Sequence, residues 1–250
     1  MTERFKNRVA VVTGGNSGIG LATAKAFARE GARVVITGRS AATLTAAQKE
    51  LGPQALAIKA DVSHLPEIAA AMNTIKERFG RIDALFVNAG IGKFVPFEEV
   101  TEEFYDETMN ANLKGAFFTV QKAVPLLSDG AAVVLNGSIN AHMGMPNSSV
   151  YGASKAAVVN LAKTLSADLL PRGVRVNVIS PGPVETAIID RMGLSEEQTH
   201  QTKEWIRQQV PLKRFAHPDE IAAAVLYLSS ADSRFIVGTE LVVDGGMIQL

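Results

Sequence analysis

The chain alternates between short apolar runs and longer stretches with helical spacing, and this alternation constrains its fold more than any other feature. Most of the short runs are continuously apolar, which is typical of strands buried on both faces of a parallel sheet. Strands are predicted over Arg8–Thr13, Arg33–Thr37, Ala55–Lys59, Ile82–Val87, Ala131–Asn136, Val174–Ser180 and Leu241–Val243. Helices are predicted over Ile19–Glu30, Thr43–Leu51, Pro66–Phe79, Phe104–Leu127, Ser149–Leu170 and Pro218–Ser229. The pattern predicts an α/β fold, with a doubly wound parallel sheet of about seven strands and helices on both faces.

A single domain over residues 1–250 is the simplest interpretation, because no linker rich in Pro, Gly or Ser interrupts the alternation. The segment 183–215 departs from the alternation of strands and helices, since it contains no predicted strand and places apolar residues among polar ones. A long excursion between a strand and the next core helix is often a substrate lid. A surface decoration that covers the sheet is the alternative.

Composition excludes several classes of protein. The 25 Lys and Arg residues balance 25 Asp and Glu residues, so the concentrated positive charge typical of nucleic-acid binders is missing. The chain has no cysteine, which excludes disulfides and thiolate ligands, and its 4 histidines lack the spacing of metal ligands. No signal-peptide core is visible, and no apolar run approaches the ~20 residues of a membrane span. We expect a cytoplasmic protein with no metal, nucleic-acid partner or membrane partner.

A glycine-rich turn, Thr13-Gly14-Gly15-Asn16-Ser17-Gly18-Ile19-Gly20, connects the first predicted strand to a helix. Glycines there let backbone N–H groups approach a phosphate, which the positive end of the helix dipole also attracts. The spacing is Gly-x3-Gly-x-Gly, not the standard Gly-x-Gly-x-x-Gly fingerprint, and a simple βα turn is the alternative. Its place in the βαβ pattern favours a dinucleotide site in a Rossmann fold.

The end of the second strand indicates which dinucleotide is preferred. An acidic residue there would bind the ribose hydroxyls of NAD, whereas an arginine would accommodate the 2′-phosphate of NADP. The chain has Gly38-Arg39-Ser40 and no carboxylate at this point. We expect NADP, bound by Arg39 with help from Ser40, and keep NAD as the minority alternative. A solvated surface role for Arg39 is the other interpretation.

Two further strand ends fit a nucleotide slot. Asp61-Val62 follows the third strand, where a carboxylate and the backbone could contact adenine. A helix N-cap region is the alternative there, because Ser63 and Glu67 lie nearby. Asn88-Ala89-Gly90 follows the fourth strand, where small residues would let a ring lie against the backbone, although the same residues also make a good turn.

Tyr151 and Lys155 open a long predicted helix and lie four residues apart, on one face and about 5–6 Å apart at Cβ. An ammonium beside a phenol favours the phenolate, so we expect Lys155 to lower the pKa of Tyr151 from about 10. Tyr151 could then act as general acid or base for a carbonyl/alcohol pair. Ser138, just past an apolar strand, could hold the substrate oxygen. If the Tyr–Lys pair is taken alone, a helix surface without a catalytic role is the better interpretation.

Together these motifs resemble the short-chain dehydrogenase/reductase family from Arg8 to Met247. The glycine turn, Asn88-Ala89-Gly90 and Pro181-Gly182 match its cofactor motifs, and Asn112, Ser138, Tyr151 and Lys155 match its catalytic tetrad. The resemblance implies NAD(P)-dependent carbonyl/alcohol chemistry and often a homotetramer. It also implies cofactor contacts from Tyr151 and Lys155, from Pro181 and Gly182, and from the following Val184 and Thr186. Asn112 is implied to support a water that returns the proton. The chain departs from many NADP-preferring members in having no basic residue before the second glycine.

The substrate is less well defined by the sequence. The candidate pocket positions are mainly apolar and uncharged: Phe94, Ile139, Asn140, Met145, Val150, Val184, Ile188, Met192 and Trp205. They favour a small neutral ketone, aldehyde or alcohol, although several could be core residues. Two other functions stay open: a 3-oxoacyl-[acyl-carrier-protein] reductase, which would need a basic docking patch, and a non-catalytic NADP-sensing module, which would not need the tetrad.

Overall fold

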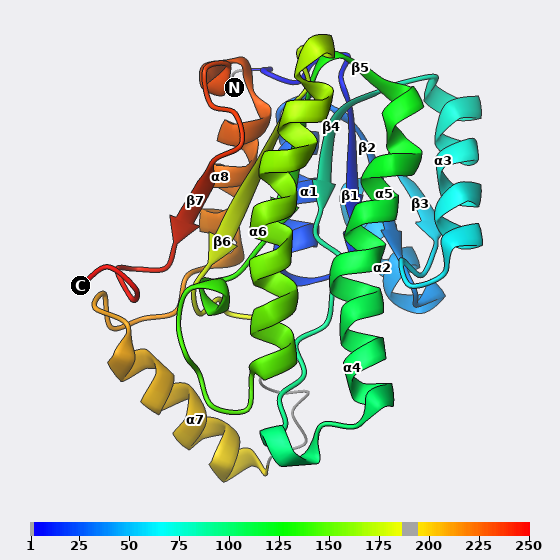
Figure 1. The fold of residues 1–250 in the computed structure, drawn as a ribbon. Helices are drawn as coiled ribbons and strands as arrows, with labels where there is room; N and C mark the ends of the chain where they lie inside the picture. The colour runs from blue at the N-terminus through cyan, green and yellow to red at the C-terminus, as the bar shows by residue number, and fades with distance from the viewer. Residues whose placement is uncertain (1–2, 187–194) are drawn as a thin grey trace.

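The computed structural model describes residues 3–186 and 195–250, and its strands form one parallel sheet. The strands are β1 (Val9–Thr13), β2 (Arg33–Gly38), β3 (Leu56–Lys59), β4 (Ile82–Val87), β5 (Leu127–Asn136), β6 (Arg175–Pro181) and β7 (Glu240–Val243). Their spatial order is β3-β2-β1-β4-β5-β6-β7, so the chain winds outward in both directions from the β1–β4 pair (Figure 1). The predicted doubly wound Rossmann fold is confirmed.

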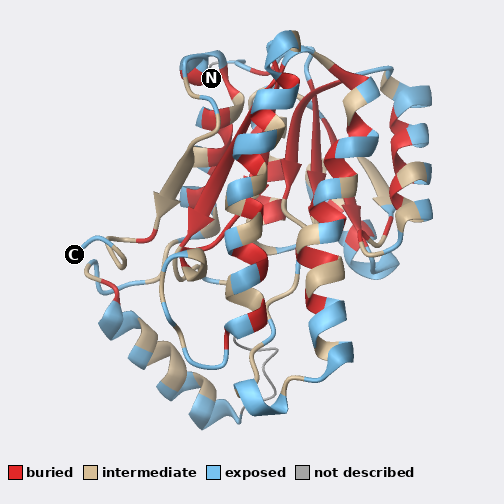
Figure 2. Cartoon of the chain, viewed as in Figure 1, coloured by how far each residue is buried: buried red, intermediate tan, exposed pale blue. Residues whose placement is uncertain are grey.

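Helices cover both faces of this sheet. They are α1 (Gly18–Arg29), α2 (Ala41–Leu51), α3 (Leu65–Phe79), α4 (Glu102–Met109), α5 (Gly115–Ala123), α6 (Ser149–Leu169), α7 (Glu196–Gln209) and α8 (Pro218–Ser229). One buried core lies between the sheet and α3, α5 and α6, and a second lies between the sheet and α1 and α8. Figure 2 shows the central strands buried and the outer helix faces exposed. This burial explains why the strands read as continuous apolar runs.

The single helix predicted over residues 104–127 is wrong in detail. Between α4 and α5 lies a π-helical turn, Asn110–Lys114, and a 3-10 turn at Val124–Leu126 ends the segment. Pro125 lacks an N–H group, so it cannot continue the helical hydrogen bonds, and β5 begins at Leu127 rather than at Ala131. Such π turns are found frequently at functional sites, and this one contains Asn112.

The expected lid region, residues 183–215, contains α7 and no strand among its described residues. Ser195 begins α7 with a reciprocal capping box shared with Gln198. Val184 forms an isolated parallel bridge with Ala216, which ties the start of the segment to the chain just before α8. Ile188 and Met192, two of the candidate pocket residues, lie outside the described residues. Within residues 3–186 and 195–250, no helix has the length and apolar character needed to cross a membrane.

Candidate active site

The glycine turn and the Asn88 segment meet where β1 and β4 end side by side. The Thr13 hydroxyl oxygen accepts hydrogen bonds from the backbone N–H groups of Asn88 (2.9 Å) and Ala89 (3.0 Å). The Asn88 side-chain amide donates to the carbonyl oxygens of Thr13 (3.0 Å) and Gly14 (3.2 Å). This point is where the strand order reverses, and open α/β sheets bind ligands at the carboxyl ends of strands at such switch points.

The glycine turn has the properties of a phosphate site. Gly14 and Gly18 have φ values of +62° and +51°, which L side chains rarely adopt. Within the described chain, the Ser17 side chain makes no capping hydrogen bond and the first turn of α1 carries no acidic residue. The N–H groups that begin α1 therefore have neither a Ser17 cap nor a carboxylate of their own turn to satisfy them, which suits them to a pyrophosphate. Thr186 lies over this turn, since a Cβ on Gly18 would lie 3.2 Å from its methyl group.

The end of β2 forms a small polar cluster. Arg39 is exposed, and Ser40 accepts a hydrogen bond from the Thr43 N–H (3.4 Å) at the start of α2. Asn16 donates to the Thr43 hydroxyl (2.7 Å) and covers Gly38, where an added Cβ would lie 2.5 Å from the Asn16 Oδ1. Thr43 is a polar neighbour that the sequence analysis did not single out. A cation, two hydroxyls and an amide make this cluster a suitable environment for a phosphate.

Asp61 lies close enough to Arg39 for their charges to interact. Burial by itself would raise the pKa of Asp61, but hydrogen bonds from the Ser63 N–H and hydroxyl and the charge of Arg39 hold it below its usual range. The Asp61 N–H donates to Glu67 (2.9 Å), so this segment also has the local bonds of a helix start. Val62 is buried against α5, where a Cβ on Gly115 would lie 2.9 Å from the Val62 carbonyl oxygen.

The carboxyl end of β6 packs tightly on the end of β7. The Gly182 N–H donates to the Val243 carbonyl (2.9 Å), and a Cβ on Gly182 would lie 2.7 Å from the Asp244 Cα. The glycine of the Pro181-Gly182 motif is thus required by this close backbone approach. Further along the chain from this glycine, Val184 pairs with Ala216 and Thr186 lies against Gly18 of the glycine turn.

Tyr151 and Lys155 lie on one face of α6, as predicted. The Lys155 Nζ is 5.7 Å from the centroid of the Tyr151 ring, and Phe94 packs edge-on against the same ring with centroids 5.4 Å apart. The Tyr151 ring therefore contacts both an aromatic side chain and a cation. Ser138 is buried, its hydroxyl oxygen accepts a hydrogen bond from the Asn140 N–H (3.2 Å), and its hydroxyl contacts the Tyr151 phenol.

The pKa of Tyr151 differs from the sequence expectation. Burial raises it, and the contact with the Ser138 hydroxyl offsets this only in part. Lys155 does not lower it, because the ammonium lies over the ring face and donates to the Asn136 carbonyl oxygen (2.7 Å). Burial lowers the pKa of Lys155 from 10.5 to about 8. At neutral pH the phenol is thus protonated and the lysine charged.

Asn112 supports the site from the π turn. Its side-chain oxygen accepts from the Ile91 N–H (2.8 Å), and its amide donates to the Ile91 carbonyl (3.0 Å) and the Ser154 hydroxyl (3.1 Å). A Cβ on Gly90 would lie 2.8 Å from the Asn112 Oδ1 and 3.8 Å from the Lys155 Nζ. The Asn112 side chain is therefore used to fix the Gly90–Ile91 backbone beside Lys155.

Asn136 is a further site residue that the sequence analysis missed. Its carbonyl accepts a hydrogen bond from the Lys155 Nζ, and its amide donates to the Asn88 Oδ1 (3.1 Å), so it joins the glycine turn to α6. Its own Oδ1 is buried without a hydrogen-bond partner in the described structure. An unpaired acceptor between the two halves of the site fits a bound polar group. The available signal was a polar residue that ends an apolar strand two positions before Ser138.

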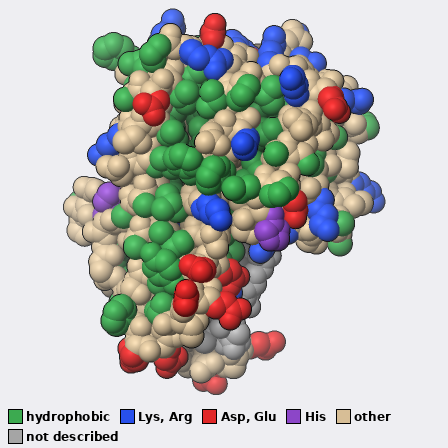
Figure 3. Space-filling view, turned by 45° about the vertical axis from the view of Figure 1, so that its right-hand side comes forward, with side chains coloured by type: hydrophobic (Ala, Val, Ile, Leu, Met, Phe, Trp, Pro, Cys, Tyr) green, Lys and Arg blue, Asp and Glu red, His purple; other side chains and the backbone are tan. Residues whose placement is uncertain are grey.

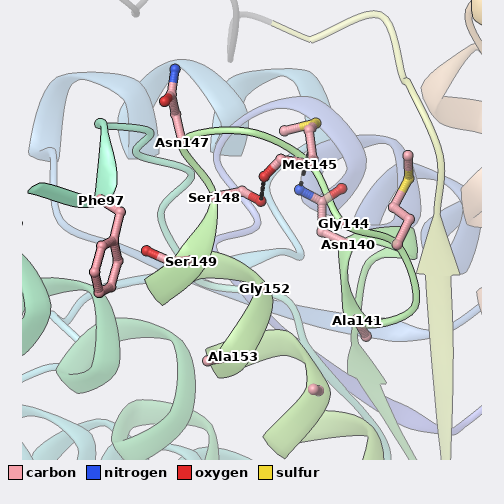
Figure 4. Close-up of a pocket in the computed structure, with 12 residues that line it drawn as sticks. Phe97, Asn140, Ala141, Gly144, Met145, Asn147, Ser148, Ser149, Gly152 and Ala153 are labelled. Atoms are coloured by element: carbon pink, nitrogen blue, oxygen red, sulfur yellow. Dashed lines mark hydrogen bonds between the residues drawn. The ribbon is translucent and has the colours of Figure 1, made fainter.

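A cavity of about 490 Å³ lies beside the α6 N-terminus, and Figure 4 shows its lining. Asn140 and Met145 line it as candidate pocket residues, together with Phe97 and small residues of α6. Those α6 residues, Ser149, Gly152, Ala153 and Ala156, share a helix face other than that of Tyr151 and Lys155. Of the other candidates, Phe94 contacts Tyr151, Ile139 and Val150 are buried in the core, and Trp205 is largely exposed.

Comparison with known proteins places this site in a family. A family model described as Enoyl-(Acyl carrier protein) reductase matches residues 14–248. The oxidoreductase asL5 of Sarocladium schorii is 40% identical over 99% of this chain and 98% of its own length. The NADP-dependent (R)-specific alcohol dehydrogenase of Lentilactobacillus kefiri is 36% identical, covering 98% of both chains.

The solved structures agree with the sequence relatives. A short-chain dehydrogenase/reductase of Brucella melitensis, titled glucose/ribitol dehydrogenase, superposes with a TM-score of 0.93 at 34% identity and covers 100% of both chains. Sequence, fold and the family model thus lead to one assignment. The chain belongs to the short-chain dehydrogenase/reductase family and is an oxidoreductase.

Proposed function

We propose that this oxidoreductase uses NADP(H) to interconvert a neutral ketone or aldehyde and its alcohol. The observation that carries the proposal is the hydrogen-bonded path from the glycine turn through Asn88 and Asn136 to Lys155, beside Tyr151 and Ser138. It joins a turn suited to a dinucleotide pyrophosphate to a phenol suited to proton transfer. The nicotinamide, when bound, supplies or accepts a hydride.

The chain's own residues supply the proton and hold the substrate oxygen. When substrate binds, the Ser138 hydroxyl donates a hydrogen bond to the carbonyl oxygen, and Tyr151 donates its proton to the same oxygen as negative charge develops. Because burial raises the pKa of Tyr151, the phenol is protonated at neutral pH and can donate its proton. This favours reduction of the carbonyl over oxidation of the alcohol. The Ser138 hydroxyl, the contact that favours the ionised phenol, stabilises the phenolate that remains.

Binding of the dinucleotide is assigned to the carboxyl edge of the sheet. The start of α1 with Asn16, Ser17 and Ile19 would hold the pyrophosphate, with Thr186 over the turn. Arg39, Ser40, Asn16 and Thr43 would hold the 2′-phosphate of NADP. NAD is the minority alternative, since Asp61 near Arg39 could instead face ribose hydroxyls.

The protein is proposed to act as a homotetramer, as members of its family often do. Two other functions compete with ketone reduction. The description of the matching family model keeps an acyl-carrier-protein substrate open, and a cofactor-sensing module would bind NADPH without turnover.

A panel of ketones, with NADPH or NADH followed at the reduced-cofactor absorbance, tests the proposal. We expect turnover of neutral ketones with NADPH and a Tyr151→Phe variant that binds NADPH normally but retains under a few per cent of kcat. Higher kcat/KM on acyl-carrier thioesters would favour the carrier reductase. Tight NADPH binding without turnover of any ketone would favour the sensor.

A further inference from the structure

The loop that follows Ser138 packs on α6 through Ile139 and Asn140, but its hydrogen bonds to the rest of the described molecule are made at one residue. Ser138 caps a 3-10 turn, Ile139–Ala141, whose last residue is followed by His142. The turn's own bonds run from the Ala141 N–H to the Ser138 carbonyl (3.0 Å) and from the His142 N–H to the Ile139 carbonyl (2.9 Å). Among hydrogen bonds between described residues, residues 139–145 reach beyond residues 138–148 only through the His142 side chain.

The partner of His142 is Glu240 on the edge strand β7. The His142 Nε2 lies 2.7 Å from the Glu240 Oε1 and 2.8 Å from its Oε2. The Ser180 hydroxyl on β6 donates to the same carboxylate (2.5 Å), so Glu240 is fixed from the sheet side. The Glu240 side chain is only 15% exposed, and His142 is the one basic side chain in contact with its carboxylate in the described part of the chain.

We propose that His142 is a positioning residue, which holds the Ser138 loop against the sheet through Glu240 and so keeps the Ser138 hydroxyl in place for the substrate oxygen. The inference rests on the proposed function. His142 and Ser138 stand at the two ends of one 3-10 turn, so the anchoring of His142 bears on the placement of Ser138 through the bonds of that turn. A misplacement of about 1 Å in a catalytic geometry can cost about 100-fold in rate.

Three variants separate positioning from plain stability. His142→Ala removes the contact, whereas His142→Gln keeps an N–H donor near the position of Nε2. His217→Ala is the matched control, because His217 caps α8 by accepting from the Asp219 N–H and lies outside the loop and the site. For a ketone that the wild type reduces, we expect kcat of H142A to fall at least about tenfold, with NADPH binding unchanged. H142Q should stay within about threefold of wild type, and H217A should lose thermal stability but not kcat.

A second measurement needs no turnover. The Asn140 and Ala141 N–H groups bond to the Ser138 Oγ and carbonyl, so their hydrogen exchange reports the placement of Ser138. We expect exchange at both amides to be at least about tenfold faster in H142A and Glu240→Ala, near normal in H142Q, and no faster in the double variant. Unchanged exchange in H142A, or H142Q as impaired as H142A, overturns the proposal. If the wild type reduces no ketone, the proposed function fails while this exchange still decides whether His142 places Ser138.

Discussion

Lys155 is a single site residue whose buried charge lowers the stability of the folded chain. It is 5% exposed, and burial lowers its pKa from 10.5 to about 8. Below pH 8 the folded chain therefore holds an ammonium that would be better hydrated in the unfolded chain. Between about pH 8 and 10.5 the unfolded chain binds a proton that the folded chain does not, so stability rises with pH in this window. The full effect is on the order of 3 kcal/mol.

Lys155→Met should therefore stabilise the apo protein at pH 7 and lose that advantage by pH 10. The gain is reduced by about 1 kcal/mol, because the hydrogen bond to the Asn136 carbonyl is lost. Thermal unfolding at both pH values measures it, with the exposed Lys163→Met on the same helix as control. A K155M protein less stable than wild type at pH 7 would mean that Asn136 and the Tyr151 ring compensate fully for burial of the charge.

Arg39 is the residue on which the proposed NADP preference depends. A charge-assisted hydrogen bond to a phosphate contributes roughly 1.5–3 kcal/mol, so Arg39→Ala should weaken NADPH binding about 10- to 100-fold. NADH binding should change by less than about threefold, because NADH lacks the 2′-phosphate. Titration of both cofactors by fluorescence tests this, with Arg29→Ala at the far end of α1 as a control of equal charge. Equal weakening for both cofactors would assign Arg39 a general role rather than a selective one.

At the scale of elements, the π turn Asn110–Lys114 is the feature that positions Asn112. Asn112→Ala would remove two hydrogen bonds from the half-buried backbone of Ile91, which costs about 1–3 kcal/mol in total. We expect a melting temperature several degrees lower and reduced kcat, because the Gly90–Ile91 backbone lies beside Lys155. Asn110→Ala is the matched control: it changes the same turn, and its side chain makes no hydrogen bond to the described residues. Similar losses in both variants would contradict a specific role for Asn112.

The π turn is also an element that the sequence did not predict, in contrast to the strands. The apolar runs of β1, β4, β5 and β6 are buried on both faces, so their number and parallel arrangement follow from periodicity. The glycine turn and the Tyr151–Lys155 spacing are local sequence patterns, so they too could be identified from the sequence. The π turn is stabilised by bonds between Asn112 and Ile91, 21 residues apart, and no local periodicity encodes it. The Lys155–Asn136 bond is likewise a tertiary contact, and it redirects the ammonium that was expected to act on the Tyr151 hydroxyl.

The whole molecule presents exposed apolar side chains in two separate regions. One comprises Phe97 (79% exposed), Tyr105 (47%) and Phe117 (39%) on and before α4 and α5. The other comprises Tyr227 (40%), Phe235 (100%) and Val237 (39%) at the end of α8 and before β7. Figure 3, with the α5 side turned forward, shows apolar side chains gathered in a band on that face. A dimer needs one such self-complementary surface, whereas a tetramer with three two-fold axes needs at least two.

The proposed tetramer can therefore be taken apart in steps. We expect the wild type to have about four times the 26.6 kDa chain mass by size exclusion with light scattering. Phe117→Asp and Phe235→Asp each place a charge in one region and should each give dimers, since the other region still pairs; the double variant should be monomeric. Lys76→Asp, on the exposed face of α3, is the control and should remain tetrameric. A monomeric wild type, or two single variants that both stay tetrameric, would show that these apolar regions do not hold the subunits together.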